Sequence, residues 1–314
     1  MTWMAVLAAI NVAAIGGRDA ARANPPAAAL LLDPHSSAEL RLPPVTSGAA
    51  AAGKRVRATA PEYAGTSVYH TIFLPISWRP DWRRTGTRWP IIFEYTGNWF
   101  PKAGSTGAVK DAALGYGLSG GKYIWVVLPY IRTGGRANER TWWGDVDRTV
   151  AYAKTNVPRI IEQFGGNRKT VFLCGFSRGA IGVNFIGLHD NEIAKMWTAF
   201  ITHDHFDGVK QWRGTDWGSP LAQYRQHAAE RLRRVGKRPY LICQNGTGYG
   251  TDAFVRSVLP NADNFTYIDV STKDIFGSFP NDLAVAAHND RWLLKPSKYR
   301  TRVWKWMNDV VQRR

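Results

Sequence analysis

The stretch VFLCGFSRGA, residues 171–180, decides the fold, because it joins an apolar run to a turn of small residues. The run before the turn predicts a buried strand, and the run after it, GAIGVNFIG, predicts a helix. Gly175, Ser177 and Gly179 form the pattern Gly-x-Ser-x-Gly between them. A sharp strand-to-helix turn of this kind excludes side chains at both glycines and exposes the serine hydroxyl at the edge of a sheet.

Ser177 has two interpretations. The pattern alone arises by chance and also marks ordinary tight turns, in which the serine is only a small polar residue. In the strand-to-helix context, the helix N-terminus adds partial positive charge where an oxyanion would develop beside the serine. We therefore favour Ser177 as a nucleophile.

Other apolar runs predict the rest of the sheet. Strands are expected at residues 67–75, 90–98, 123–130, 170–174, 195–202, 238–245 and 264–272. Helices are expected at residues 146–164 and 179–189, and over a closing segment that contains Tyr299 and Val311. Strands that are apolar throughout and alternate with helices predict an α/β fold, with a mostly parallel sheet and helices on both faces.

Composition divides the chain into three parts. Residues 1–23 contain an apolar stretch followed by the small-x-small cleavage pattern ARA, and we interpret them as a signal peptide that lacks the usual basic start. Residues 24–64 are rich in Ala, Pro and Ser and are expected to form a linker or a loosely docked arm, ahead of a main domain at residues 65–314. A secreted or periplasmic protein is expected, with an Ala-rich disordered leader as the alternative. No later segment is predicted to cross a membrane.

The charge balance is strongly basic, since 41 Lys and Arg residues outnumber 24 Asp and Glu residues and give a net charge of +17. Such an excess favours anionic partners, although a soluble enzyme with a basic exterior is the simpler interpretation. No nucleic-acid-binding module is recognisable, and we expect no nucleic-acid partner. Cys174 and Cys243 lie in apolar strand-like runs and are expected to be buried free thiols.

These motifs resemble the α/β-hydrolase superfamily, and in particular its secreted esterases of the feruloyl and acetylxylan type. The resemblance rests on GFSRG at residues 175–179, on the strands YHTIFLP and PIIFEYTGN ahead of it, and on a histidine in AAHNDRW near the C-terminus. It covers residues 65–314 and implies an α/β-hydrolase catalytic domain with a nucleophile elbow and no cofactor.

The resemblance also implies a catalytic triad in the chain order serine, acid, histidine. It assigns the nucleophile to Ser177 and the base to His288, which follows the last predicted strand. The acid is expected after the penultimate strand, where Asp252 is the only carboxylate in the loop GTGYGTDAFVRS. Asp204 and Asp207, after the preceding strand, stay open as alternatives.

An oxyanion hole needs two backbone N–H groups. The family takes one from the residue after the nucleophile, here Arg178, and one from the loop after the strand PIIFEY. Many relatives carry His-Gly-Gly in that loop, whereas this chain has Thr96-Gly97-Asn98. Thr96 and Gly97 are therefore the expected donors, with Asn98 behind them.

A competing motif is THDHFDG, residues 202–208. His203, His205 and Asp207 match the beginning of the His-x-His-x-Asp-His metal motif of metallo-β-lactamase-type hydrolases, but Gly208 replaces the final histidine. We therefore expect no metal. His203 and His205 either line the pocket beside the serine or belong to an ordinary polar loop.

Aromatic residues follow several of the predicted strands, and in a parallel sheet such loops open on one edge. Trp99 and Trp143 are expected there as substrate-binding residues, together with Asn98 and the two histidines. Flat aromatic surfaces suit sugar rings or aryl groups.

The sequence therefore predicts a secreted serine hydrolase that cleaves a carbohydrate-linked or aromatic carboxylic ester through an acyl-enzyme. Its expected partner is a small-molecule or polysaccharide ester. Two alternatives stay open: a peptidase or polyester depolymerase of the same fold, and a non-catalytic protein that keeps the scaffold and binds anionic glycans.

Overall fold

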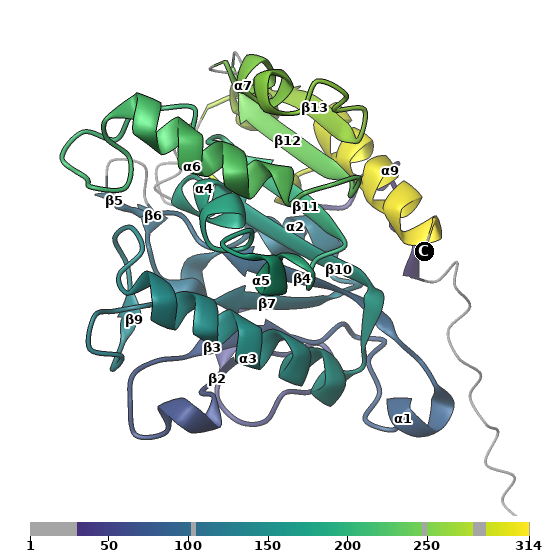
Figure 1. Cartoon of the computed structure of the whole chain (residues 1–314). Helices are drawn as coiled ribbons and strands as arrows, with labels where there is room; N and C mark the ends of the chain where they lie inside the picture. Colours follow the sequence, from purple (N-terminus) through teal and green to yellow (C-terminus); the bar gives the residue numbers. More distant parts are fainter. Residues whose placement is uncertain (1–29, 102–104, 247–249, 279–286, 314) are drawn as a thin grey trace, which may run out of the picture.

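The computed structural model describes residues 30–101, 105–246, 250–278 and 287–313. A nine-stranded sheet runs through its centre in the order β1-β2-β3-β7-β4-β10-β11-β12-β13 (Figure 1). Its strands are β1 (Val45–Thr46), β2 (Arg55–Ala58), β3 (His70–Phe73), β4 (Trp89–Tyr95), β7 (Ile124–Leu128), β10 (Gly166–Phe176), β11 (Ala199–His203), β12 (Tyr240–Asn245) and β13 (Phe265–Val270). Only the pairs β2–β3 and β3–β7 of this sheet are antiparallel. The mostly parallel sheet expected from the sequence is confirmed.

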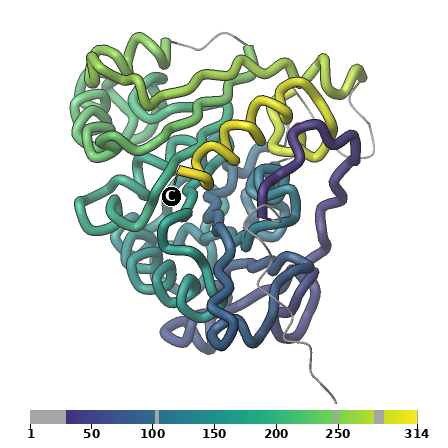
Figure 2. Tube along the Cα trace, turned by 90° about the vertical axis from the view of Figure 1, so that its right-hand side faces the viewer, coloured from purple at the N-terminus to yellow at the C-terminus, as the bar shows by residue number. Residues whose placement is uncertain are grey.

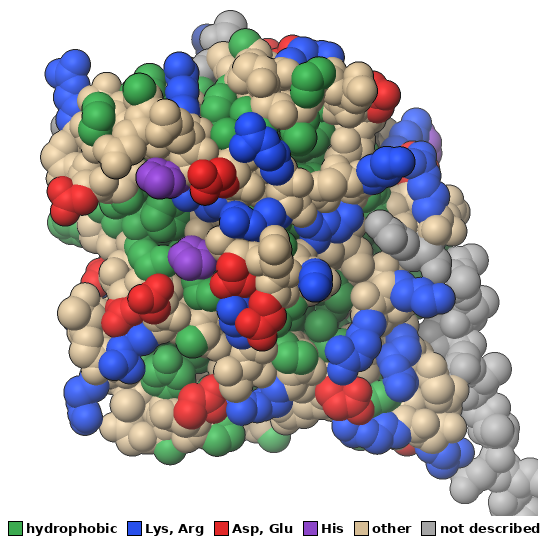
Figure 3. Space-filling model, viewed as in Figure 1, with side chains coloured by type: hydrophobic (Ala, Val, Ile, Leu, Met, Phe, Trp, Pro, Cys, Tyr) green, Lys and Arg blue, Asp and Glu red, His purple; other side chains and the backbone are tan. Residues whose placement is uncertain are grey.

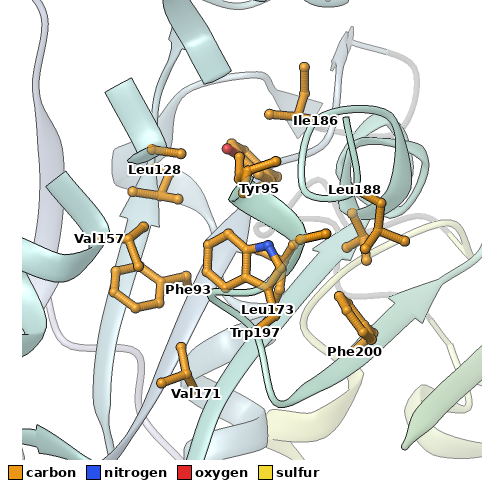
Figure 4. Packing of buried hydrophobic residues seen from close by; sticks show 14 of the residues in the cluster. Phe93, Tyr95, Leu128, Val157, Val171, Leu173, Ile186, Leu188, Trp197 and Phe200 are labelled. Carbon is orange, nitrogen blue, oxygen red and sulfur yellow. The ribbon is translucent and has the colours of Figure 1, made fainter. Parts of the chain in front are cut away.

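Helices cover both faces of the sheet, as predicted (Figure 1). Helices α3 (Val146–Phe164), α4 (Arg178–Phe185) and α6 (Leu221–Arg233) pack on one face, where apolar side chains of neighbouring strands meet Trp197 in the core shown in Figure 4. Helices α2 (Leu114–Ser119) and α9 (Lys298–Gln312) pack on the other face. The other α-helices of the described residues are α1 (Trp82–Thr85), α5 (Asn191–Ala194), α7 (Thr251–Val258) and α8 (Thr272–Phe276).

Two short hairpins lie beside the main sheet. One pairs β5 (Trp99–Phe100) with β6 (Ser105–Thr106), and the other pairs β8 (Tyr130–Ile131) with β9 (Asn138–Glu139). The first hairpin follows β4 and the second follows β7, so both emerge where parallel strands end. This is the edge of the sheet at which ligands bind in parallel α/β folds.

The described part of the N-terminal segment, from residue 30, contacts the rest of the fold, where its composition alone predicts a linker or a loosely docked arm. Arg55 of β2 is buried, donates to the carbonyl of Val109 at 3.0 Å and lies over the Trp125 ring at 4.0 Å. The backbone of Leu32 exchanges two hydrogen bonds of 2.9 Å with the Asn308 side chain, so this segment lies against α9 (Figure 2). The segment also pairs with β3 through β2, and strands as short as β1 and β2 leave little pattern in the sequence. The expected signal peptide lies outside the described residues.

Helix α6 was missed by the sequence analysis for a physical reason. Only Tyr224, Ala228 and Leu232 of it are buried, at a spacing of four, and most of its other residues are polar. So narrow a stripe gives a weak helical period.

Lys and Arg side chains are spread over the face shown in Figure 3, with acidic side chains among them. Cys174 and Cys243 are buried free thiols, as predicted. In the part of the chain that the structure describes, no helix combines the length and apolar character needed to cross a membrane.

Candidate active site

Ser177 occupies the turn between β10 and α4. Its φ of 55° and ψ of −118° lie in a region that residues other than glycine rarely adopt. A Cβ atom at Gly175 would collide with the carbonyl of Gly179, and a Cβ atom at Gly179 would collide with the carbonyl of Tyr95. The close approach of β4, β10 and α4 therefore requires both glycines of the motif, as the sequence indicated.

The neighbouring strand β11 brings a carboxylate to this turn. Phe176 pairs with His203 in the β10–β11 register, and the N–H of Ser177 donates to the carbonyl of His203 at 3.0 Å. Asp204 follows His203 directly, with a positive φ of 76° and only 4% of its surface exposed. The serine and the aspartate thus follow the ends of adjacent parallel strands.

His288 contacts both strand ends. Its Nδ1 lies 2.6 Å from Oδ2 of Asp204, and its ring centroid lies 4.5 Å from that of Phe176, the residue before Ser177. The other carboxylate oxygen, Oδ1, accepts the backbone N–H of Asn245 at 2.9 Å. With a proton on Nδ1 directed at the carboxylate, Nε2 of the imidazole is left as an acceptor.

The surroundings of Asp204 keep it ionised. Burial opposes its charged form, but the attraction of His203, the hydrogen bond with His288 and the N–H of Asn245 outweigh burial and lower the pKa of the carboxyl. Nearby, burial lowers the pKa of His205 to about 4, so this imidazole is neutral at pH 7. Its ring centroid lies 5.2 Å from that of His288.

The structure does not bring Asp252, the acid expected from the sequence, to His288. Asp252 is exposed in the first turn of α7, where it accepts the Nε of Arg256 at 2.9 Å. Asp207, one of the alternatives, is buried and held by Arg231 at 2.7 Å and by the hydroxyl of Tyr224 at 2.7 Å. Asp204, the other alternative, is the carboxylate beside His288. The loop after β12 turns into a helix that carries Asp252 to the surface.

The backbone groups expected for an oxyanion hole lie close to the serine. Arg178 is the first residue of α4, so its N–H has no carbonyl one turn earlier to receive it. Thr96 and Gly97 directly follow β4, whose Tyr95 pairs with Gly175 of β10. Both are buried, and a Cβ at Gly97 would touch the Phe176 ring.

The residues expected to bind substrate fall into two groups. Trp99 is 51% exposed and Phe100 next to it is 48% exposed, while His205 lies beside His288. The other three are occupied inside the protein. Asn98 accepts the N–H of Trp142 at 2.7 Å through Oδ1, Trp143 is buried and stacks on Phe185, and His203 is buried and stacks on Phe176.

An aromatic cluster adjoins His205. The ring of Trp142 lies 4.9 Å from the rings of both Trp212 and Trp217, and the ring of Trp212 lies 5.3 Å from that of His205. The cluster therefore connects the segment after the β8–β9 hairpin with the loop after β11, next to His205.

Comparison with known proteins bears on the fold. No family model and no curated protein matches the sequence. An S-formylglutathione hydrolase from Agrobacterium tumefaciens matches with a TM-score of 0.51 at 14% identity, over 85% of this chain and 99% of that one. A sugar hydrolase from Lactococcus lactis matches with a TM-score of 0.51 at 12% identity, over 83% of this chain and 98% of that one. The chain has the α/β-hydrolase fold.

Two further matches are more distant. A feruloyl esterase module from Clostridium thermocellum matches at 10% identity and a TM-score of 0.48, over 83% of this chain and 94% of that one. An isopeptidase matches with a TM-score of 0.47 at 14% identity over 82% of this chain, which spans only 39% of the isopeptidase's length.

Within the α/β-hydrolase fold, the motif THDHFDG is the end of β11 and the loop that follows. Asp207 is committed to Arg231 and Tyr224, and His203 is enclosed by aromatic rings. Among the described residues, no three His, Cys, Asp or Glu side chains gather as a metal site would require.

Sequence reasoning missed two features of this site. The sequence analysis assigns a role only to the backbone N–H of Arg178. The structure shows that its guanidinium is also fully buried. The sequence predicts Asn98 as a substrate contact, whereas its side chain accepts the N–H of Trp142 and so holds the Trp142 loop. A charged residue inside a turn of small residues was the available signal for the first, because a buried arginine needs several acceptors.

Proposed function

We propose that the chain is a serine hydrolase that cleaves carboxylic esters through an acyl-enzyme. The observation that carries the proposal is the strained turn at Ser177, with the His288–Asp204 pair at the end of the adjacent strand. A serine hydroxyl is a weak nucleophile at neutral pH and needs such a base, and the base needs an orienting acid.

Each group has one role in the proposed reaction. The Oγ of Ser177 attacks the ester carbonyl while Nε2 of His288 takes its proton, and the carbonyl electron pair moves to the oxygen. Backbone N–H groups of Arg178 and of the Thr96–Gly97 segment bind that oxyanion. Collapse of this tetrahedral intermediate breaks the bond to the alcohol, which leaves with the proton from His288. Water then attacks the acyl-enzyme by the same route and releases the acid and free Ser177.

Asp204 supports this cycle without bonding to substrate. Its carboxylate accepts a hydrogen bond from the protonated Nδ1 of His288. This bond selects the tautomer with a free Nε2 and stabilises the imidazolium that forms during the reaction. The lowered pKa of Asp204 agrees with that role, because the group has to stay ionised while the imidazole gains its proton.

The proposed substrates are esters with an aromatic or carbohydrate part. The half-exposed rings of Trp99 and Phe100 follow the Thr96–Gly97 segment and offer flat apolar surface to such a group. The sequence of residues 1–23 supports an exported enzyme, and N-terminal sequencing of protein recovered from the periplasm or medium tests this export.

Labelling with a fluorophosphonate, followed by mapping of the modified residue, tests the nucleophile without a guess about substrate. We expect one label, on Ser177, and hydrolysis of p-nitrophenyl acetate that Ser177→Ala abolishes. Ser257→Ala, at an exposed position of α7, is the matched control and should keep both the labelling of Ser177 and the hydrolysis. If the wild-type protein is not labelled and does not hydrolyse aryl esters, the proposal is wrong. Tight binding of anionic glycans by that inert protein would favour the binding protein, and cleavage of a peptide panel would favour the peptidase.

A further inference from the structure

Arg178 carries a buried charge that the proposed chemistry does not use. Its side chain is 0% exposed, and no carboxylate of the described residues forms an ion pair with it. Burial lowers the pKa of its guanidinium to about 10, so the group is still charged at pH 7. A charge in that position must be satisfied by dipoles.

Three backbone carbonyls and one ring satisfy it. Nη1 donates to the carbonyl of Trp142 at 2.7 Å, and the guanidinium lies 4.1 Å from the centre of the Tyr130 ring. Nη2 lies 3.4 Å from the carbonyl of Gly107, and Nε lies 3.5 Å from that of Thr96. The Trp142 bond is the strong one, and the two longer contacts act mainly as charge–dipole attraction.

These carbonyls are not an arbitrary set. Thr96 precedes the β5–β6 hairpin and Gly107 follows it, so the guanidinium holds both legs of the hairpin that carries Trp99. Gly107 has a φ of +68°, and a Cβ there would meet the carbonyl of Arg140. The base of the hairpin therefore has no room to move toward Arg140.

The contact with Thr96 bears directly on the oxyanion hole. The carbonyl of Thr96 and the N–H of Gly97 belong to one peptide group, and in a planar trans peptide they point in opposite directions. A cation on the carbonyl side therefore fixes the plane of this peptide and directs the Gly97 N–H away from the guanidinium. It also polarises the peptide, which makes the N–H a better donor.

Both backbone polar groups of Trp142 are held by side chains. Its carbonyl accepts from Arg178 and its N–H donates to Oδ1 of Asn98 at 2.7 Å, while its φ is 49°. A non-glycine residue keeps such a backbone only where its surroundings enforce it. Arg178 and Asn98 together thus tie the Trp142 loop to the segment after β4.

We propose that Arg178 is a positioning residue of the ester hydrolase proposed above: its guanidinium fixes the Thr96–Gly97 peptide, the base of the β5–β6 hairpin and the Trp142 loop, so that the second oxyanion donor is aligned before substrate binds. One residue then supplies one donor through its backbone and positions the other through its side chain. The planar fork of arginine suits this task, whereas lysine offers a single ammonium that cannot reach three divergent carbonyls with fixed geometry.

The kinetic consequence is specific. Donor alignment matters most when charge develops on the carbonyl oxygen, so its loss lowers kcat more than it raises KM. We expect Arg178→Met to lower kcat on p-nitrophenyl acetate by about 10- to 100-fold, less than or equal to the loss of a donor itself, with KM within about threefold. A boronic acid that forms a tetrahedral adduct with serine should bind more weakly by a similar factor.

Arg300→Met is the matched control. Arg300 is also buried, donates to the carbonyls of Leu294 and Ser36 at 3.2 and 2.7 Å, and lies over the Trp304 ring. None of these contacts involves the Thr96–Gly97 peptide, the β5–β6 hairpin or the Trp142 loop. Both variants should unfold at lower temperature, and only Arg178→Met should lose kcat and boronate affinity. Arg178→Lys should have a kcat between those of wild type and Arg178→Met.

Hydrogen exchange supplies a readout that needs no activity. In Arg178→Met, amides of residues 97–100 and 141–144 should exchange faster than in wild type, and in Arg300→Met they should not. A folded Arg178→Met protein with wild-type kcat, or one whose loops exchange as in wild type, overturns the positioning role. Failure of the proposed function is distinct, because it appears in wild type as absence of labelling and turnover.

Discussion

Nδ1 of His288 and Oδ2 of Asp204 lie 2.6 Å apart although 84 residues separate them in the chain. Two strands of the sheet and the loop before α9 bring them together beside the turn that holds Ser177. The pairing explains how an imidazole whose side chain is 29% exposed keeps one orientation: its partner is almost fully buried and is itself fixed by Asn245.

The first prediction separates the two candidate acids. Asp204→Asn should lower kcat/KM on an aryl ester by about three to four orders of magnitude, because an amide in this place favours the wrong imidazole tautomer. Asp252→Asn is the matched variant and should change the rate by less than about twofold, since it disturbs an exposed pair with Arg256 away from His288. Steady-state kinetics of both proteins decide between them. If Asp252→Asn is the inactive one, the assignment of Asp204 is wrong.

The fold class and the position of Ser177 were predictable because they depend on local patterns. An apolar strand, two glycines that no side chain can replace and a small-residue helix are contiguous in the chain. The choice among carboxylates was not local. Asp204 and Asp252 both follow predicted strands, and only the left-handed turn at Asp204 and the start of α7 at Asp252 send their side chains to different places.

The N-terminal arm shows a second limit. The strand that contains Arg55 is four residues long, and its arginine is buried only because carbonyls from the segment after β6 and the Trp125 ring receive it. A charged residue in an Ala-rich segment predicts exposure when neighbours in space are unknown. Long-range acceptors of this kind, for Arg55 as for Arg178, leave no periodic trace in the sequence.

The second prediction concerns His70, which is buried in β3 with its Nδ1 2.7 Å from the hydroxyl of Tyr152. Burial lowers its pKa from 6.5 to about 4. The unfolded chain therefore binds a proton between these values that the folded chain does not, so stability should fall as pH drops from 6.5 toward 4, by at most about 1.4 kcal/mol per pH unit from this group.

Urea unfolding of wild type and His70→Gln at pH 7 and pH 4.5 measures this effect. Glutamine can still accept the Tyr152 hydroxyl, so the variant should lose less stability over the interval than wild type does. His227→Gln, at an exposed position of α6, is the control and should follow wild type. Equal losses in all three proteins would show that His70 is not responsible.

The third prediction concerns a group whose contribution to folding stability changes with pH in the opposite direction to that of His70. Glu94 is fully buried in β4, and burial together with the nearby Asp290 raises its pKa from 4.5 to about 8. The folded state holds its proton more tightly than the unfolded chain, so this contribution is complete below pH 4.5 and is lost as pH rises toward 8.

Glu94→Gln mimics the protonated acid and keeps an acceptor for the N–H groups of Gly115 and Trp125, which both reach Oε2 at 2.8 Å. Relative to wild type, it should gain stability between pH 5 and pH 8, by about 1 kcal/mol or more. Denaturation at the two pH values provides the measurement. A difference between variant and wild type that stays constant with pH would mean that the carboxyl is ionised throughout.

The last prediction tests the aromatic edge of the proposed ester site. Trp99 and Phe100 are among the few large apolar side chains that the described fold leaves exposed, and they sit on the hairpin held by Arg178. Trp99→Ala should raise KM for a feruloyl or other aryl-acid ester several-fold, about 1 kcal/mol for one stacking contact, and leave KM for a small acetate ester unchanged. The ratio of the two KM values isolates the stacking surface from any change in folding.

Ile76→Ala is its control, because Ile76 is 83% exposed but follows β3, whose antiparallel direction puts its end at the opposite edge of the sheet. That variant should leave both KM values alone. If Trp99→Ala changed the aryl and acetate esters equally, the hairpin would act on the oxyanion loop and not on the substrate's aromatic group. The two outcomes differ in kcat as well, since a disturbed oxyanion loop lowers kcat for every ester and a lost stacking surface lowers binding for one class.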